Sequence, residues 1–149
     1  MKDLNNKVAL LTGASSGIGA VIANLLAQEG VTVIGVARSQ RDLSNTKSII
    51  ENHGGEFHGI PFDISQTSKL SELKVQVTNA IGEVDILINN AGIEEYNYFQ
   101  DYDLEYIEKI ITVNLIAGME LTRQFLPQML DRGGHIVNIC SLSAKKGES

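Results

Sequence analysis

One feature constrains the possible folds of this chain most. It is a short apolar segment, followed by three closely spaced glycines and then by an apolar helical stretch. Residues 8–19 read Val-Ala-Leu-Leu-Thr-Gly-Ala-Ser-Ser-Gly-Ile-Gly, with glycines at Gly13, Gly17 and Gly19. This order predicts a β-strand, a tight turn and the start of a helix, where free backbone N–H groups bind anions. Glycine is needed where the backbone approaches a ligand closely or adopts a positive φ. The segment predicts a diphosphate-binding turn, and a loop that only reverses the chain is the alternative.

Short apolar runs alternate with longer helical patterns along the whole chain. The expected strands are residues 8–11, 31–36, 56–61, 85–88 and 135–139, and the expected helices are residues 18–28, 40–52, 69–80 and about 104–131. Several runs are rich in Val and Ile without strict alternation, which is typical of parallel strands covered on both faces. We predict an α/β fold: a doubly wound parallel sheet of five strands in order 3-2-1-4-5, with a ligand crevice beside the first strand. Pro127 is expected to bend the last helix or end it early.

Composition narrows the classes of partner. The 149 residues predict a single domain, and a net charge of −6 without a basic run argues against nucleic acid or an anionic membrane. No apolar run approaches the length that spans a bilayer. The single cysteine, Cys140, excludes an internal disulfide, which favours the cytoplasm. His53, His58 and His135 lack partner sets and are interpreted as structural or surface residues, so no metal site is predicted.

The residues after the second predicted strand bear on the type of nucleotide. A dinucleotide fold that prefers the unphosphorylated cofactor places an acid here to bind the ribose 2′-hydroxyl. This chain has the uncharged Ala37 near that place, followed by Arg38. A guanidinium can bind a 2′-phosphate through two charge-assisted hydrogen bonds. The pattern favours NADP over NAD, with a solvated arginine as the alternative.

Asp63 and Ile64 follow the third predicted strand. An aspartate at this place can accept a hydrogen bond from the adenine amino group, while the isoleucine packs against the ring. Asp63 or Ser65 could equally cap a helix or form a turn, and the two roles are compatible.

Two motifs together carry a family resemblance. Thr-Gly-Ala-Ser-Ser-Gly-Ile-Gly at residues 12–19 and Asn-Asn-Ala-Gly at residues 89–92 resemble the two signatures of the short-chain dehydrogenase/reductase family. The resemblance implies a Rossmann-like fold and an NAD(P)-dependent oxidoreductase. Its reaction would transfer hydride between nicotinamide and a small carbonyl or alcohol substrate. It also implies cofactor contacts by the following residues: Gly13, Ser15, Ser16, Gly17, Ile18, Gly19, Arg38, Asp63, Ile64, Asn90, Ala91 and Gly92.

The resemblance implies finer roles as well. Ser15 would be a second contact to the 2′-phosphate, and Asn89 would hold the sheet together rather than bind the cofactor. The Ile-Val-Asn-Ile-Cys-Ser run at residues 136–141 is similar to the family's fifth strand, so Ser141 would orient the substrate carbonyl, with Ser143 as the second choice. Asn114 would bend its helix and hold a water of the proton relay. Asparagine is a poor residue inside a helix, and a satisfied buried amide is the alternative.

One part of the family's machinery is missing. The family uses a tyrosine acid/base whose pKa is lowered by a lysine four residues later, and Tyr96, Tyr98, Tyr102 and Tyr106 all lack such a lysine. We therefore expect residues 1–149 to be a partial, cofactor-binding domain that is inactive alone. The sheet would be incomplete on its C-terminal side, and the chain would form a homo-oligomer. A non-catalytic dinucleotide-binding or interaction module and the product of a decayed gene remain as alternatives.

Overall fold

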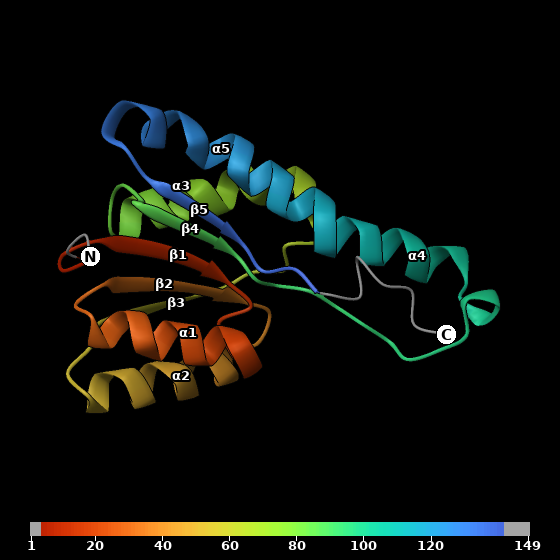
Figure 1. The fold of residues 1–149 in the computed structure, drawn as a ribbon, viewed down its shortest axis with the longest axis horizontal. Helices are drawn as coiled ribbons and strands as arrows, with labels where there is room; N and C mark the ends of the chain where they lie inside the picture. The colour runs from red at the N-terminus through yellow and green to blue at the C-terminus, as the bar shows by residue number, and fades with distance from the viewer. Residues whose placement is uncertain (1–3, 142–149) are drawn as a thin grey trace.

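The computed structural model describes residues 4–141, which form one parallel sheet with helices on both faces (Figure 1). The strands are β1 (Val8–Thr12), β2 (Thr32–Ala37), β3 (Phe57–Pro61), β4 (Ile86–Asn89) and β5 (His135–Asn138). They lie in the order β3-β2-β1-β4-β5, and each neighbouring pair is parallel. The predicted fold class and strand order are confirmed.

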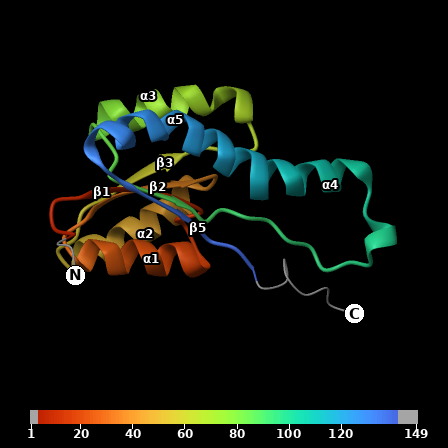
Figure 2. The ribbon, with the colours of Figure 1, turned by 45° about the horizontal axis from the view of Figure 1, so that its top comes forward.

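The helices divide between the two faces of the sheet (Figures 1 and 2). α1 (Gly17–Gln28) and α2 (Gln40–Asn52) cover one face, while α3 (Leu70–Ala80) and α5 (Ala117–Arg132) cover the other. α4 (Leu104–Ile111) continues through the π-helical segment η3 (Thr112–Ile116) into α5. The three segments form one long helical rod whose α4 end extends beyond the sheet. Two short 3₁₀ turns, η1 (Thr67–Lys69) and η2 (Phe99–Asp101), precede α3 and α4.

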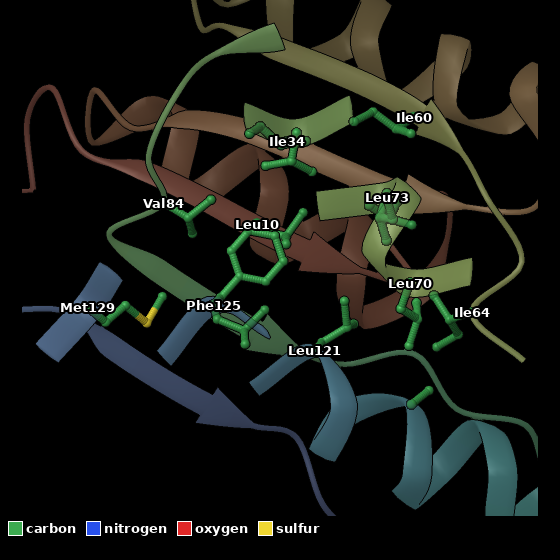
Figure 3. Packing of buried hydrophobic residues seen from close by; sticks show 14 of the residues in the cluster. Leu10, Ile34, Ile60, Ile64, Leu70, Leu73, Val84, Leu121, Phe125 and Met129 are labelled. Carbon is green, nitrogen blue, oxygen red and sulfur yellow. The ribbon is translucent and has the colours of Figure 1, made fainter. Parts of the chain in front are cut away.

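Each face of the sheet has its own hydrophobic core. On the α3 and α5 face, Leu10 of β1 packs in one cluster with Leu121 and Phe125 of α5 (Figure 3). On the α1 and α2 face, Leu11 of β1 packs in a second cluster with Phe57 of β3. Successive residues of β1 are thus buried on opposite faces, which explains why the strand shows no alternation of apolar and polar residues.

A glycine with a positive φ follows three of the helices closely. Gly30, Gly54 and Gly133 follow α1, α2 and α5 closely, with φ of 78°, 79° and 79°. A positive φ carries no steric cost for glycine, and the N–H groups of Gly30 and Gly54 donate to the carbonyls of Ala27 and Glu51 at 3.1 and 3.0 Å, which satisfies carbonyl groups at the ends of α1 and α2.

Of the two expected effects of Pro127, an early end of the last helix is wrong. α5 continues past the proline to Arg132. Phe125 is fully buried and Met129 is 5% exposed, so the helix is anchored in the core on both sides of the missing N–H group. Burial of these side chains outweighs the loss of one backbone hydrogen bond.

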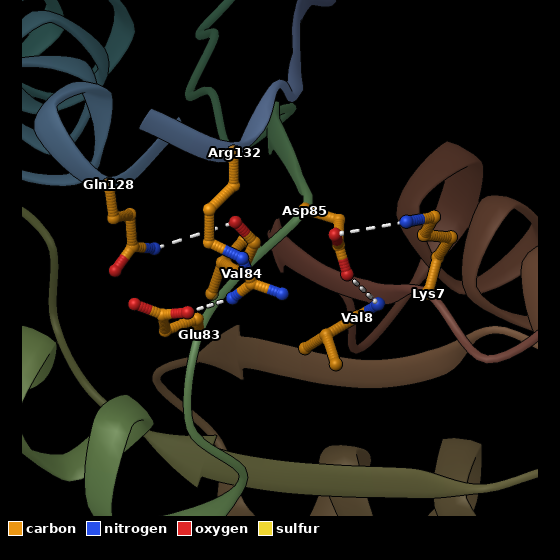
Figure 4. Close-up of polar contacts among 7 residues, drawn as sticks. All are labelled: Lys7, Val8, Glu83, Val84, Asp85, Gln128 and Arg132. Carbon is orange, nitrogen blue, oxygen red and sulfur yellow. Dashed lines mark hydrogen bonds and ion pairs between the residues drawn. The ribbon is translucent and has the colours of Figure 1, made fainter. Parts of the chain in front are cut away.

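Polar contacts fix the amino ends of the strands (Figure 4). Asp85 accepts hydrogen bonds from the backbone N–H of Val8 at 2.9 Å and from Lys7 Nζ at 3.3 Å. Arg132 at the end of α5 forms an ion pair with Glu83. These contacts hold β4 against β1 and against α5 at the amino ends of the strands. Ligands bind in folds of this class at the opposite end of the sheet, beyond the carboxyl ends of the strands.

β5 lies at one edge of the sheet and is largely exposed. Val137 keeps 40% of its surface exposed, and Ile139, just after the strand, keeps the same share. Within residues 4–141, no helix has both the length and the apolar character that a membrane span requires.

Candidate functional site

A cleft of about 480 Å³ opens at the carboxyl ends of the central strands. The chain segments that follow β1, β2, β3 and β4 all border it. Every residue that the sequence predicts as a cofactor contact borders this cleft except Gly17. They are Gly13, Ser15, Ser16, Ile18, Gly19, Arg38, Asp63, Ile64, Asn90, Ala91 and Gly92.

The glycine turn after β1 brings the start of α1 very close to the end of the strand. A Cβ atom on Gly19 would lie 2.0 Å from the carbonyl oxygen of Gly13, so only glycine fits there. Gly13 itself has a φ of 70°, and a Cβ on it would lie 2.8 Å from Asn90 Nδ2. Gly17 has a φ of 52° and open space around it, so its conformation rather than crowding requires glycine.

Some amides of the turn are used within the fold and others are left for a ligand. The N–H groups of Gly13 and Ala14 both donate to the carbonyl of Val36, at 2.8 and 3.3 Å. Ser16 precedes α1 without a side-chain capping bond. The first-turn amides from Gly17 onward are therefore available, at the positive end of the helix dipole. This arrangement suits an anionic group.

Asn90 borders the cleft, but its side chain also holds two strands together. Asn90 Nδ2 donates to the carbonyl of Thr12 at 2.9 Å. Thr12 Oγ1 in turn accepts from the backbone N–H groups of Asn90 and Ala91, both at 3.0 Å. The contacts fix the ends of β1 and β4 relative to each other, so Asn90 shapes the cleft as well as bordering it.

Asn89 makes bonds of the sheet-holding kind that the resemblance implies. Its Nδ2 atom donates to Asn138 Oδ1 on β5 at 2.9 Å and to Thr122 Oγ1 on α5 at 3.2 Å. These bonds join β4 to its neighbouring strand and to the helix above them.

The ends of β2 and β3 supply the polar rim of the cleft. Arg38 follows β2 and is exposed, and Ser39 caps α2 by accepting a hydrogen bond from the N–H of Asp42 at 3.2 Å. Asp63 Oδ1 accepts from the N–H of Ser65 at 3.0 Å, so the turn-forming role is present. Ile64 is 8% exposed and supplies an apolar wall.

Asn114 has a structural partner that the sequence does not reveal. Its Oδ1 accepts from the N–H of Ile93 at 2.8 Å, and its Nδ2 donates to the carbonyl of Ile93 at 2.9 Å. Asn114 lies inside the π-helical segment and does not border the cleft, but Ile93 and Val113 do. The amide therefore fastens the chain after β4 to the helical rod, which gives a reason for asparagine inside a helix.

Ser141 lies three residues beyond β5, is exposed and does not border the cleft. The N–H of Ile139 donates to the carbonyl of Asn89 at 2.9 Å, so β5 delivers the chain toward the carboxyl end of β4. Ser143 lies outside the described residues. The catalytic roles of Ser141 and Asn114 therefore stay predictions.

The tyrosines near the start of α4 are poor candidates for an acid/base group. Tyr106 stacks on Tyr102 with ring centroids 5.2 Å apart. Partial burial, followed by the charges of Glu95 and Glu94 and the nearby Tyr102, raises the pKa of Tyr106 above its ordinary value. A phenol with a raised pKa exchanges protons inefficiently near neutral pH.

Sequence reasoning missed part of the cleft wall. Asp42, Ile93, Lys109 and Val113 also border it. Lys109 and Val113 are four residues apart and so share one face of the helical rod. That spacing was visible in the sequence, but no pattern indicated which face would turn toward the cleft.

Comparison with known proteins decides the family. The family model described as short chain dehydrogenase matches residues 7–149. The chain belongs to this family. Among short-chain dehydrogenases/reductases, ketoacyl reductase HetN of Nostoc sp. (strain PCC 7120) is 50% identical over 148 residues, which cover 99% of this chain and 52% of HetN. The chain thus spans about half the length of this curated relative.

Two solved short-chain dehydrogenases/reductases share the fold closely. A metagenomic short-chain oxidoreductase in complex with NADP has a TM-score of 0.92 and 35% identity, with 99% of this chain and 68% of that chain covered. A variant of actinorhodin polyketide ketoreductase with NADPH has a TM-score of 0.90 and 35% identity, with 99% and 58% covered. Both of these relatives carry a nicotinamide dinucleotide.

Proposed function

We propose that residues 1–149 form the NAD(P)-binding part of a short-chain oxidoreductase and that the cleft holds the dinucleotide. The close packing of Gly19 on Gly13 carries this proposal. This packing leaves no room for any side chain, and it brings the unpaired first-turn amides of α1 to the edge of the cleft. A site that presents backbone N–H groups, glycines and a helix N-terminus together suits a diphosphate.

The remaining wall residues fit the other parts of a dinucleotide. Asp63 would accept a hydrogen bond from the adenine amino group, and Ile64 would pack against the ring. On the other side of the turn, Ala91 and Gly92 carry little or no side chain, which leaves room for the ribose and nicotinamide. Asn90 would keep this wall in place through its bonds to β1.

Arg38 supports a preference for NADP over NAD. It borders the cleft directly after β2, where the ribose 2′-position of a bound dinucleotide lies in folds of this class. Ser15 borders the same cleft and would be a second contact to a 2′-phosphate.

The proposed reaction is the oxidation of an alcohol or the reduction of a carbonyl group on a small molecule. The nicotinamide, when bound, would supply or accept the hydride. Ser141 would donate a hydrogen bond to the substrate oxygen and orient it. Asn114 would hold Ile93 against the helical rod, and so keep the wall beside the reacting groups fixed.

Proton transfer needs a group that residues 1–149 do not supply. None of the four tyrosines is followed by a lysine four residues later. We therefore propose that this chain alone binds cofactor without turnover. A non-catalytic dinucleotide-binding module is the second candidate, and the lack of a lysine four residues after any of the four tyrosines favours it over a chain that is active alone.

Calorimetric titration of the purified chain with NADP⁺ and NAD⁺ tests the proposal. We expect both dinucleotides to bind, with NADP⁺ the tighter. Arg38→Ala should weaken NADP⁺ about tenfold, because charge-assisted bonds at an exposed site contribute about 1.4 kcal/mol after screening, and should change NAD⁺ less than about twofold.

Arg41→Ala is the matched control. Arg41 lies three residues after Arg38, in the first turn of α2, is exposed and does not border the cleft, so its loss should leave both affinities unchanged. Equal weakening of NADP⁺ and NAD⁺ by Arg38→Ala would refute the cofactor preference. Failure of the wild-type chain to bind either dinucleotide would refute the proposed function itself.

A further inference from the structure

The cleft contains a second cation besides Arg38. Of the charged side chains in residues 4–141, four border the cleft: Arg38, Asp42, Asp63 and Lys109. Arg38 leads from β2 into α2, whereas Lys109 belongs to α4 in the helical rod. The two cations thus come from separate elements of the fold.

Lys109 is not used for the structural roles that lysines usually have on helices. Glu105 lies four residues earlier, which is favourable spacing for an ion pair, yet within the described part of the chain the side-chain ammonium of Lys109 makes no ion pair or hydrogen bond. Lys109 also does not compensate a helix C-terminus, because α4 continues through η3 into α5. The carbonyl of Lys109 itself accepts a hydrogen bond from the N–H of Thr112.

Packing holds Lys109 at the adenosine end of the cleft. Val113, one turn later on the same face of the rod, is 8% exposed and packs in one hydrophobic cluster with Ile64. Ile64 is the residue proposed to contact the adenine ring. The rod is therefore anchored with the face that carries Lys109 and Val113 turned toward the cleft, and the side chain of Lys109 is exposed at its border.

We infer that Lys109 binds the adenosine diphosphate half that NADP and NAD share. In this role Lys109 raises the affinity for both dinucleotides, while Arg38 distinguishes between them. The charge balance supports this division. The chain carries a net charge of −6, and Asp42 and Asp63 border the same cleft, so an anionic ligand needs local cations to bind. A flexible ammonium suits a contact to phosphate oxygens that needs no fixed geometry. The inference rests on the proposed function of the cleft.

The test compares Lys109→Gln, which removes the charge and keeps a side chain of similar shape, with the wild-type chain. We expect the dissociation constants of NADP⁺ and NAD⁺ to rise by the same factor, about fivefold, as for a partly screened charge. The salt dependence of both affinities should become weaker. Lys109→Arg, which keeps the charge, should bind both dinucleotides as the wild type does.

Arg41→Gln is the matched control, because it removes the same charge from an exposed position outside the cleft and should change neither affinity. Circular dichroism of each variant establishes that it is folded. If the wild-type chain binds both dinucleotides and Lys109→Gln binds them equally well, the inference about Lys109 is overturned while the proposed function stands. Weakening of NADP⁺ alone, or failure of Lys109→Arg to retain affinity, also overturns it. A wild-type chain that binds neither dinucleotide overturns both proposals.

Discussion

β1 and β5 belong to the same sheet but lie in opposite surroundings. Four of the five residues of β1 are buried, between β2 and β4 and beneath helices on both faces. Within residues 4–141, β5 pairs only with β4, and none of the residues of β5 is fully buried. The proposed cofactor cleft is formed by the segments after β1, β2, β3 and β4 together with Lys109 and Val113 of the helical rod, whereas Ser141 follows β5. The proposed binding residues and the proposed catalytic serine are thus supported by strands that differ in how far they are buried and packed.

The same substitution in a buried and an exposed strand should show this difference most strongly. Val33 of β2 is fully buried and Val137 of β5 is 40% exposed. Val33→Ala should lower the free energy of unfolding by about 2 kcal/mol, because it removes buried methyl groups and leaves a cavity. Val137→Ala should lower it by less than about 0.5 kcal/mol.

Urea unfolding followed by circular dichroism measures both values. Equal losses for the two variants would mean that β5 is covered in solution by a surface that the described residues do not include, such as a second copy of the chain. That result would contradict the difference in burial between the interior strands and β5.

The next prediction tests whether cofactor binding depends on the close packing within the glycine turn after β1. Gly19→Ala should weaken NADP⁺ binding at least about tenfold, since the added methyl group collides with the carbonyl of Gly13 and shifts the amides of α1. Gly17→Ala has open space and suffers only its positive φ, so the loss should be smaller. Calorimetric titration gives both values, and a greater loss for Gly17→Ala would contradict the geometry proposed for the turn.

The smallest effect is expected from an exposed ion pair on α5. Hydrogen bonds from Arg123 and then Gln124 lower the pKa of the Glu120 carboxyl to about 2. Since this pKa lies below the ordinary value of 4.5, the stabilisation is present above pH 4.5 and is lost as the pH falls toward 2.

Glu120→Gln should therefore be slightly less stable than wild type at pH 6, by less than about 1 kcal/mol at this screened site. The two chains should become equally stable near pH 2. Urea unfolding at several pH values measures the difference, and a gap that stays constant with pH would exclude the ion pair as its cause.

The fold class and the strand order could be predicted from the sequence because the patterns that indicate them are local. The glycines near the ends of α1, α2 and α5, together with the unbroken apolar strands, follow from φ preferences and burial on two faces. The expectation that Pro127 ends the helix early was wrong because the neighbouring Phe125 and Met129 are anchored in the core, and that packing is a tertiary effect.

The residues of the candidate site that follow a strand could be predicted from the sequence. The residues whose place depends on helix packing could not. Arg38, Asp63 and Asn90 each lie just after a strand, so the parallel topology alone brings them to one edge. Lys109 borders the same cleft from the helical rod, whose Val113 belongs to the same hydrophobic cluster as Ile64. The bond between Asn114 and Ile93 joins two segments whose distance apart no sequence pattern gives.

A crystal structure of the chain grown with excess NADP⁺ tests the central claim most directly. We expect a diphosphate within hydrogen-bonding distance of the first-turn amides of α1, with the 2′-phosphate beside Arg38 and the adenine beside Ile64. A dinucleotide bound elsewhere on the chain, or a glycine turn without a nucleotide at saturating concentration, would contradict it.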